Sequence, residues 1–565
     1  RWSVLITIAF SGAVSMGAQV VWTRIMGLML GATVYVFSII LAVFLTGLGA
    51  GAALGSWAGR RWNPRVLLGW SQALAALGLA WTAWQVGTSL PYWPVAPQNN
   101  TAPSIIFQLD LVRCIWALLP ATFFWGAAVP LAFAGAARQG SDPGRTVAGV
   151  YAANTLGAIA GALLVSLVLI PVVGTQTTQK ILIVGSILAT ATALAPLVRE
   201  AAPRGVALAG LTVAIAWGGV LAAAAPKVPP ELIAYGRRTA QYLDEFQVLE
   251  SHEGRNTSIA ITKWADGSIQ FHVAGKVEAS NNPYDMRLQR MLGYMPALFE
   301  ANPKSVLVVG FGAGVTAGSF TTYPSIQKIV ICEMEPIIPP TTTKWFAEQN
   351  HSVIRDRRTR IIYDDARHFV LTTKEKFDVI TSDPIHPFVK GSASLYSKEY
   401  FEMLRDHLNP GGVVTQWIPL YESDFPTVKS EIASFFAAFP YASVWANTSD
   451  GAGYDLVLIG YTRPMVMDLP AAQARFDQPA YAAMKADIQQ VGFTDTRSMY
   501  DTYSGDKFGL ADFVKGAEIN RDRDLRLQYL AGLSLNRNLG DPIYRQIAQS
   551  KPILPKGLTV IFAKP

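Results

Sequence analysis

Three acidic residues of this chain each follow an apolar run that is typical of a buried strand. Glu333 ends the run IVIC, Asp365 follows IIYD, and Asp383 follows DVITS. The carboxyl ends of the strands of an open parallel sheet border one crevice, so these acids should be neighbours in space. A carboxylate there can hold ribose hydroxyls, accept from an adenine amino group or take a proton from an amine. We therefore predict a site that binds a nucleoside and acts on an amine.

A glycine-rich turn precedes the first of these acids. The run VLVVG leads into G-x-G-x-G at Gly310, Gly312 and Gly314, and Glu333 follows about twenty residues later. Glycine permits positive φ and close approach of a ligand, and the amides of the next helix face that ligand. Such a turn alone can be purely structural. Together with Glu333 as the ribose-binding acid, it predicts a nucleoside-binding β-α-β unit.

Asp383 is the candidate catalytic residue. The strand order places it above the reacting end of a nucleoside donor, where its carboxylate can deprotonate or orient an amine. Pro384 follows it directly. The alternative is that Asp383 only caps the next element in an Asp-Pro turn.

The elements that position these residues begin after a linker at 226–232. A segment of β alternation with turns at Ala265-Asp266-Gly267 and Gly275-Lys276 predicts a small β subdomain, followed by a helix over 286–299. Strands then alternate with helices, which predicts a doubly wound, mostly parallel sheet. We expect the linker, the β subdomain and the connecting helix at 226–300, a Rossmann-like α/β domain at 301–462, and an extension packed on it at 463–565.

The whole chain is 51% hydrophobic and only 15% charged, and the first 225 residues carry few of the charges. This composition predicts a multi-pass α-helical membrane domain at 1–225, with the lipid bilayer as a partner. No buried acid or base marks an ion route within the spans. Seven crossings are expected, at 3–22, 30–57, 65–86, 112–136, 147–173, 177–198 and 205–225.

Basic residues concentrate in alternate short loops, at 58–66, 137–146 and 199–204. Basic loops stay on the cytoplasmic side, so the N-terminus should be inside and the soluble domain extracytoplasmic. The localisation expected is a bacterial inner (plasma) membrane.

Two classes of site are excluded by composition. The net charge is +7, yet no dense Lys/Arg run with interleaved aromatic residues indicates a nucleic-acid partner. The six histidines lack metal-ligand spacing, so no metal site is expected.

The order GFGAG, CEMEP, DDAR, DVITSDP, LYSKEYFEML and LNPGGVVTQW resembles the spermidine synthase family of polyamine aminopropyltransferases over roughly 250–462. With the opening SGAVSMGAQVVWTRIMGLMLG, the chain resembles the fused transporter-like/spermidine synthase proteins of bacteria. The resemblance implies a Rossmann-like core, decarboxylated S-adenosylmethionine as the donor and a polyamine as the acceptor. It matches Glu333 to the ribose-binding acid, Asp365 with Ala366 to the adenine-binding pair, and Asp383 to the catalytic aspartate.

The chain departs from the family pattern at several positions. Ala313 replaces the aspartate that meets the donor's ammonium, and His386 replaces the second aspartate of the D-x-x-D-P loop, either as a surface loop residue or as a catalytic one. The acceptor-binding helix has Leu288, Arg290 and Tyr294 in place of Tyr, Glu and His. An arginine in that row would repel a cationic diamine.

Three hypotheses follow. The first is a membrane-anchored aminopropyltransferase whose small amine acceptor is not free putrescine. The second is a methyltransferase, because Ala313 removes the feature that selects the decarboxylated donor over S-adenosylmethionine. The third is a non-catalytic subunit or scaffold, with partners in a membrane complex or in a homo-oligomer.

Overall fold

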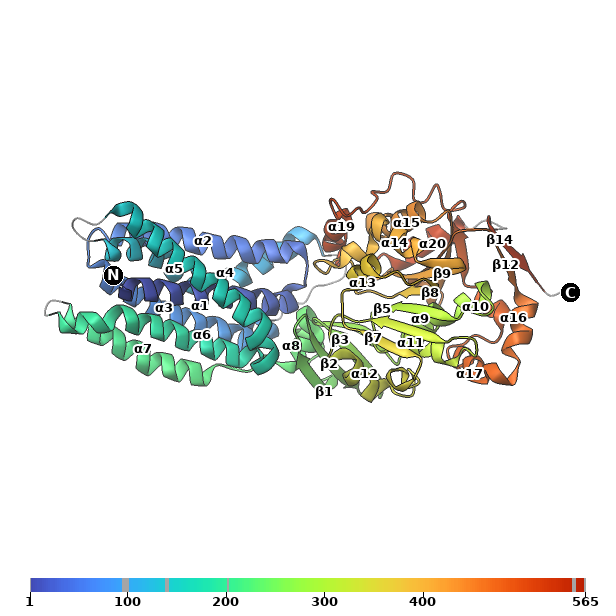
Figure 1. Cartoon of the computed structure of the whole chain (residues 1–565), viewed down its shortest axis with the longest axis horizontal. Helices are drawn as coiled ribbons and strands as arrows, with labels where there is room; N and C mark the ends of the chain where they lie inside the picture. The colour runs from blue at the N-terminus through green and yellow to red at the C-terminus, as the bar shows by residue number, and fades with distance from the viewer. Residues whose placement is uncertain (1, 94–100, 138–141, 201–202, 551–554, 563–565) are drawn as a thin grey trace. The chain divides into compact units, whose positions relative to one another are not determined.

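The computed structural model describes the whole chain except residues 1, 94–100, 138–141, 201–202, 551–554 and 563–565. The chain divides into two compact units (Figure 1). The first comprises Arg1–Ala96, Ser104–Leu243 and Glu253–Ser258, and the second comprises Pro97–Pro103, Asp244–His252 and Ile259–Pro565.

Long apolar helices make up the first unit. Six helical segments among the described residues have the length and composition to cross a membrane. One of them, Pro143–Arg199, breaks at Gly174, where φ is 75° and ψ is 169°. This segment contains both predicted spans 147–173 and 177–198. The seven crossings expected from the sequence therefore correspond to six helical segments here. The long helices are α1 (Trp2–Leu30), α2 (Val34–Ala58), α3 (Pro64–Trp84), α4 (Pro103–Ala136), α5 (Pro143–Leu164), α6 (Ile170–Leu194) and α7 (Arg204–Ala224).

Small residues let α1 and α5 approach backbone to backbone. A Cβ on Gly157 would overlap the carbonyl of Ala9, and one on Gly161 would overlap that of Ala13. Such small-residue contacts are common where helices pack in lipid. Between α5 and α6 the chain forms a π-helix, η3 (Val165–Leu169).

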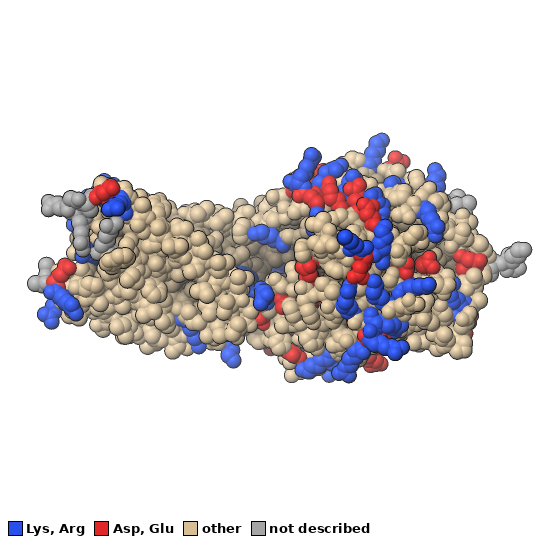
Figure 2. Space-filling model, in the orientation of Figure 1, with Lys and Arg blue, Asp and Glu red and all other residues tan. Residues whose placement is uncertain are grey.

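Charges are sparse on this unit, and those on the face shown in Figure 2 gather towards its ends. Two charged residues border the start of the predicted span 112–136. Asp110 and Arg113 in α4 are both buried, with 3.9 Å between Oδ1 and Nη1. They stand one helical turn apart, so each neutralises the other locally. In the loops expected to be cytoplasmic, residues 138–141 and 201–202 lie outside the described residues.

The second unit begins with an antiparallel β sheet of order β1-β2-β3-β4. Its strands are β1 (Phe246–Glu253), β2 (Ser258–Trp264), β3 (Ile269–Val273) and β4 (Lys276–Ser280). Both predicted hairpin turns are present, and Gly267 (φ 87°) and Gly275 (φ 82°) supply the positive φ that each requires.

An eight-stranded sheet follows, in the order β13-β10-β11-β9-β8-β5-β6-β7. Strands β9, β8, β5, β6 and β7 are parallel, while β11, β10 and β13 continue the sheet in antiparallel pairing. The bounds are β5 (Ser305–Val309), β6 (Lys328–Cys332), β7 (Thr359–Ile362), β8 (Phe377–Ser382), β9 (Leu408–Pro419), β10 (Tyr441–Ser449), β11 (Ala452–Tyr461) and β13 (Tyr503–Asp506).

Helices cover both faces of this sheet (Figure 1). Along β5, Val306 and Val308 belong to one hydrophobic core, and Leu307 and Val309 belong to the other. This alternation explains why the strand is apolar throughout. One face carries α9 (Pro283–Tyr294), α11 (Val315–Ser319) and α12 (Ile338–Phe346), and the other carries α13 (Ala366–Thr372), α14 (Lys398–Asp406) and α15 (Phe425–Ala438).

The chain after β11 adds peripheral elements to the same unit. Strand β12 (Met465–Asp468) pairs in parallel with β14 (Leu558–Ile561). Strand β13 instead joins the edge of the large sheet beside β10. The helices of this extension are α16 (Leu469–Phe476), α17 (Ala482–Gln490), α18 (Thr496–Tyr500), α19 (Arg526–Ser534) and α20 (Gly540–Gln549).

Candidate active site

In the parallel part of the large sheet, the order in which the chain adds strands reverses between β5 and β8. The chain leaves β5 for β6 and β7 on one side and then returns to β8 on the other. Ligands of open α/β sheets bind at such a switch point, outside the carboxyl ends of the strands. Gly310 follows β5 and Asp383 follows β8, and a Cβ on Gly310 would lie 3.5 Å from the carbonyl oxygen of Asp383. The predicted glycine turn and the predicted base therefore share this point.

The glycine turn has the conformation that its residue types favour. Gly310, Gly312 and Gly314 have φ values of 83°, 55° and 78°. Side chains strongly disfavour this region, which explains a glycine at each position. Gly314 stands directly before α11, so the first amides of that short helix face the end of the sheet.

Glu333 holds the glycine turn in place. Its Oε2 accepts from the Phe311 amide at 2.9 Å, and its Oε1 accepts from the Glu335 amide at 2.8 Å. The side chain is buried, and burial raises the pKa of Glu333. Each carboxylate oxygen has two lone pairs, so these amides leave acceptor capacity for a ligand hydroxyl. The structure thus shows a role in shaping the turn that the sequence did not predict.

Asp365 and Ala366 lie at the start of α13. Oδ1 of Asp365 accepts from the amides of Arg367 (2.7 Å) and His368 (3.2 Å), which makes this residue the N-cap. Its side chain is exposed, whereas Ala366 is buried. The capping interaction fixes the carboxylate at the strand end without enclosing it.

Asp383 is half-buried at the end of β8. Burial, with a smaller contribution from the charge of Asp285, raises the pKa of Asp383 to about 7. A carboxyl group with that pKa exchanges its proton near neutral pH, which suits a general base.

Three further acids surround Asp383 and form with it the acidic cluster (Glu278, Asp285, Asp383 and Asp455). Burial raises the pKa of Glu278 to about 8; Lys276 opposes the rise, and Asp383 and Glu422 add to it. Burial likewise raises the pKa of Asp455, and the charges of Asp285 and Asp383 add to the rise. Each acid is therefore close enough to another to affect its proton affinity.

Neighbouring hydroxyl and indole groups orient the acidic cluster. Asp285 accepts from Ser280 Oγ and, at 3.3 Å, from the hydroxyl of Tyr454. Asp455 accepts from Trp417 Nε1 at 2.8 Å. Tyr454 stacks on Tyr421 with ring centroids 5.0 Å apart.

Sequence reasoning missed Glu278, Asp285 and Asp455, which come from β4, α9 and β11. Each is a single acid in an ordinary segment, so no local motif marks it. Only the arrangement of the two sheets and α9 brings them together.

The interpretation of His386 as a surface residue is wrong. The ring is 1% exposed and packs against Trp417, Tyr421 and Phe388, at centroid distances of 4.8, 5.3 and 5.3 Å. Its Nδ1 lies 4.0 Å from Oε2 of Glu278. Burial and the nearby Lys276 lower the pKa of His386, so the ring is neutral at pH 7.

The acceptor-helix argument from Arg290 also requires correction. The guanidinium is 1% exposed, with Nη1 3.0 Å from Asp487 Oδ2, and Nη2 donates to the carbonyl of Gln349 at 2.8 Å. Tyr294 likewise donates to Asp487, and Leu288 is buried in a hydrophobic core. Arg290 is therefore neutralised by Asp487, and it provides no reason to exclude a cationic acceptor.

Among the described residues, no group of three or more His, Cys, Asp and Glu side chains has the arrangement of a metal site.

Comparison with known proteins places residues 285–462 in the spermine/spermidine synthase domain family. The polyamine aminopropyltransferase of Saccharolobus solfataricus is 31% identical over 216 residues, which cover 36% of this chain and 70% of that protein. The enzyme of the same name from Aeropyrum pernix is 26% identical over 193 residues, covering 34% and 60%. A crystal structure of spermidine synthase with the transition-state analogue AdoDATO aligns at 20% identity and a TM-score of 0.37, covering 43% of this chain and 88% of that chain.

Proposed function

Because the chain belongs to the spermidine synthase family of polyamine aminopropyltransferases, we propose that its second unit transfers an aminopropyl group from decarboxylated S-adenosylmethionine to an amine. The observation that carries the proposal is the acidic cluster beside the switch point. Four carboxyl groups converge there, next to the stacked rings of Tyr421 and Tyr454. Carboxylates and aromatic faces are the groups that attract an alkylammonium cation.

The donor half of the proposed site uses the residues at the strand ends. Gly310, Gly312 and Gly314 leave room for the nucleoside, and Glu333 accepts from its ribose hydroxyls while holding the turn. Asp365 and Ala366 border the adenine. These roles agree with the positions that the family resemblance implies.

The proposed reaction is a nucleophilic substitution. The acceptor amine loses a proton to Asp383, and its lone pair attacks the aminopropyl carbon next to the sulfonium. The new C–N bond forms as the C–S bond breaks, and the electron pair of that bond neutralises the sulfonium. The products are methylthioadenosine and a secondary amine. Asp383 with a pKa of about 7 can accept the proton and later release it to water.

The departures from the family bear on the donor and the acceptor. Ala313 is buried and its carbonyl accepts from Asn350 Nδ2 at 2.9 Å, so no carboxylate stands at this position to meet a donor ammonium. This favours methyl transfer from S-adenosylmethionine as the second candidate function. His386 fills the place of a second acid, and this supports an acceptor other than free putrescine. Arg290 does not support that conclusion, because Asp487 neutralises its charge.

We further propose that the first unit anchors the enzyme in a bacterial inner membrane. Its six long apolar segments, and the scarcity of charge between their ends, support this placement. A scaffold in a membrane complex would keep the same anchor while lacking turnover.

The test uses the full chain, purified in detergent. It is incubated with decarboxylated S-adenosylmethionine or S-adenosylmethionine and a panel of diamines and polyamines, and products are identified by mass spectrometry. Aminopropylated amine together with methylthioadenosine is the expected result. Methylated product would instead establish the methyltransferase.

Asp383→Asn is the informative variant, because it keeps the shape of the side chain and removes the base. General-base assistance contributes about a hundred- to ten-thousandfold, so turnover should fall by that factor while nucleoside affinity is retained. Asp512→Asn, an exposed acid of the extension, is the matched control. Turnover that survives Asp383→Asn within about tenfold would place the base elsewhere. Nucleoside binding without turnover in the parent chain would support the scaffold.

A further inference from the structure

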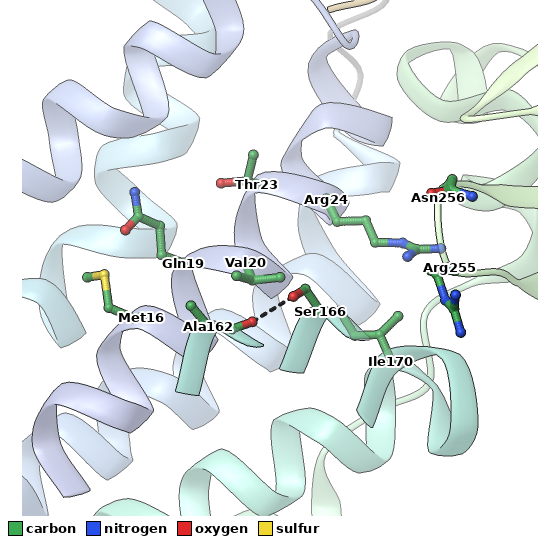
Figure 3. A pocket seen from close by; sticks show the side chains of 10 residues that line it. All are labelled: Met16, Gln19, Val20, Thr23, Arg24, Ala162, Ser166, Ile170, Arg255 and Asn256. Atoms are coloured by element: carbon green, nitrogen blue, oxygen red, sulfur yellow. Dashed lines mark hydrogen bonds between the residues drawn. The ribbon is translucent and has the colours of Figure 1, made fainter. Parts of the chain in front are cut away.

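A cavity of about 500 Å³ lies in the first unit, and none of its lining residues belongs to the acidic cluster (Figure 3). Its lining comes from one face of α1, from the junction of α5, η3 and α6, and from the turn between β1 and β2. Figure 3 shows Arg24 and Asn256 at one end of the cavity and Met16 and Gln19 at the other. The lining residues are Met16, Gln19, Val20, Thr23, Arg24, Ala162, Ser166, Ile170, Arg255 and Asn256.

The local geometry of the helices explains why a cavity forms here. At Gly157 and Gly161 the backbones of α1 and α5 touch, so no side chain fits between them. Directly afterwards the helix widens into the π-helix η3, in which Ser166 Oγ turns back to the Ala162 carbonyl at 2.7 Å. Such π-helical turns are frequent at functional sites. Tight packing followed by a π-helix therefore opens a space between the two helices.

Two arginines give this cavity a positive end. Arg24 is half-buried, and its Nη2 donates to Ser258 Oγ at 3.0 Å, which directs the guanidinium along the cavity wall. Arg255 joins it from the β1–β2 turn. None of the described lining residues is acidic. Glu253, the last residue of β1, accepts hydrogen bonds from the amide and hydroxyl of Thr175, and these bonds stabilise its charge.

The cavity lining also includes apolar side chains, and neighbouring residues in the sequence expose apolar side chains. The apolar lining residues are Met16, Val20, Ala162 and Ile170. Leu163, Leu164, Leu167 and Val168, from the same turns of α5 and η3, are exposed by 53%, 54%, 53% and 46%. Apolar side chains exposed beside a cationic cavity fit a ligand with a charged head and a hydrocarbon chain.

We propose that this cavity binds one anionic phospholipid, with its phosphate on Arg24 and Arg255 and the start of an acyl chain along α1 and η3. The guanidinium group suits phosphate because it offers paired N–H donors in a planar fork. Gln19, Thr23 and Ser166 offer further polar contacts to the glycerol region. The proposal rests on the membrane anchor of the proposed function, and it adds a lipid preference that anchoring alone does not require.

The experiment reconstitutes the full chain into nanodiscs of phosphatidylcholine with and without phosphatidylglycerol, and it counts retained lipids by native mass spectrometry. We expect one phosphatidylglycerol to be retained in preference to phosphatidylcholine. Arg24→Gln and Arg255→Gln should each reduce that preference about fivefold. Arg204→Gln, an exposed arginine at the start of α7, is the matched control and should not change it. Ala162→Phe, which fills the cavity without changing charge, should reduce retention of either lipid.

The outcomes separate the lipid site from its alternatives. Equal preference in Arg24→Gln, Arg255→Gln and Arg204→Gln would overturn the proposal. Displacement of the bound lipid by millimolar inorganic phosphate would show that the cavity selects a free anion, which also overturns it. Extraction of native membranes with alkaline carbonate tests anchoring separately: release of the chain contradicts the membrane anchor, whereas retention without lipid preference contradicts only the lipid site.

Discussion

Nη1 of Arg290 and Oδ2 of Asp487 lie 3.0 Å apart in the interior of the second unit, joining α9 to α17 of the C-terminal extension. The same carboxylate accepts from Tyr294 and, at 2.7 Å, contacts His351 Nε2. Next to His351, Asn350 Nδ2 donates to the carbonyl of Ala313 inside the glycine turn. The extension is thereby connected to the donor side of the proposed active site through two side-chain contacts and the peptide bond between Asn350 and His351.

Asp487→Asn should destabilise the protein and weaken donor binding. Breaking a buried ion pair costs about 3 to 5 kcal/mol, because Arg290 keeps an uncompensated charge. We expect a lower midpoint of thermal unfolding and a higher KM for the donor, with a smaller change in the KM for the acceptor. Asp477→Asn, an exposed ion-pair partner of Lys485 in the same extension, is the control and should match the parent. Equal changes in both KM values would indicate general loosening and contradict the connection to the glycine turn.

Glu333→Gln should weaken binding of methylthioadenosine by roughly ten- to a hundredfold, since charge-assisted hydrogen bonds contribute about 1.5 to 3 kcal/mol. The amide retains one oxygen for the Phe311 N–H, so the glycine turn keeps part of its support. Isothermal calorimetry measures the change, with Glu348→Gln on the surface as the control. Unaltered affinity in the Gln variant would contradict the assignment of Glu333 to nucleoside binding.

The pH dependence of activity and of stability should have opposite signs. Asp383 must be deprotonated to accept a proton, so kcat/KM should rise through about pH 7. The folded state holds protons on Asp383 and Glu278 that the unfolded chain releases at lower pH. Their contribution to the free energy of unfolding is therefore present at about pH 4 and is lost as pH rises towards about 8. Pairing Asp383→Asn with Glu278→Gln should flatten this loss; an unchanged slope would contradict the raised pKa values.

Loops 58–66, 137–146 and 199–204 should face the cytoplasm, with the second unit outside, because basic residues are retained on the cytoplasmic side during insertion. A reporter fused after Pro565 measures this directly. Alkaline phosphatase should be active there and a fluorescent protein should not. The reverse pattern would place the second unit beside its cytoplasmic donor.

The sequence was informative where function depends on a local pattern. The glycines at 310, 312 and 314, Glu333 and the strand before Asp383 all lie where alternation of strands and helices predicted them. The hairpin turns of the β subdomain followed from Gly267 and Gly275 in the same way.

Longer-range features were beyond such reasoning. The acidic cluster is assembled from β4, α9, β11 and the end of β8, and its members have no spacing to detect. Arg290 was misjudged because its partner Asp487 lies 197 residues further along the chain. His386 lies in a loop, yet the rings of Phe388, Trp417 and Tyr421 enclose it, and the last two come from β9 and from the residues just after it.

The acidic cluster also holds protons that a bound cation can displace. With the pKa of Asp383 at about 7 and that of Glu278 at about 8, both groups are partly protonated at neutral pH. A bound polycation stabilises their charged forms and so releases protons to the buffer. The apparent enthalpy of polyamine binding should then vary with the ionisation enthalpy of the buffer, and the slope of that plot counts the protons released. A calorimetric series in phosphate and Tris would thus report occupation of the cluster even for an acceptor that never reacts.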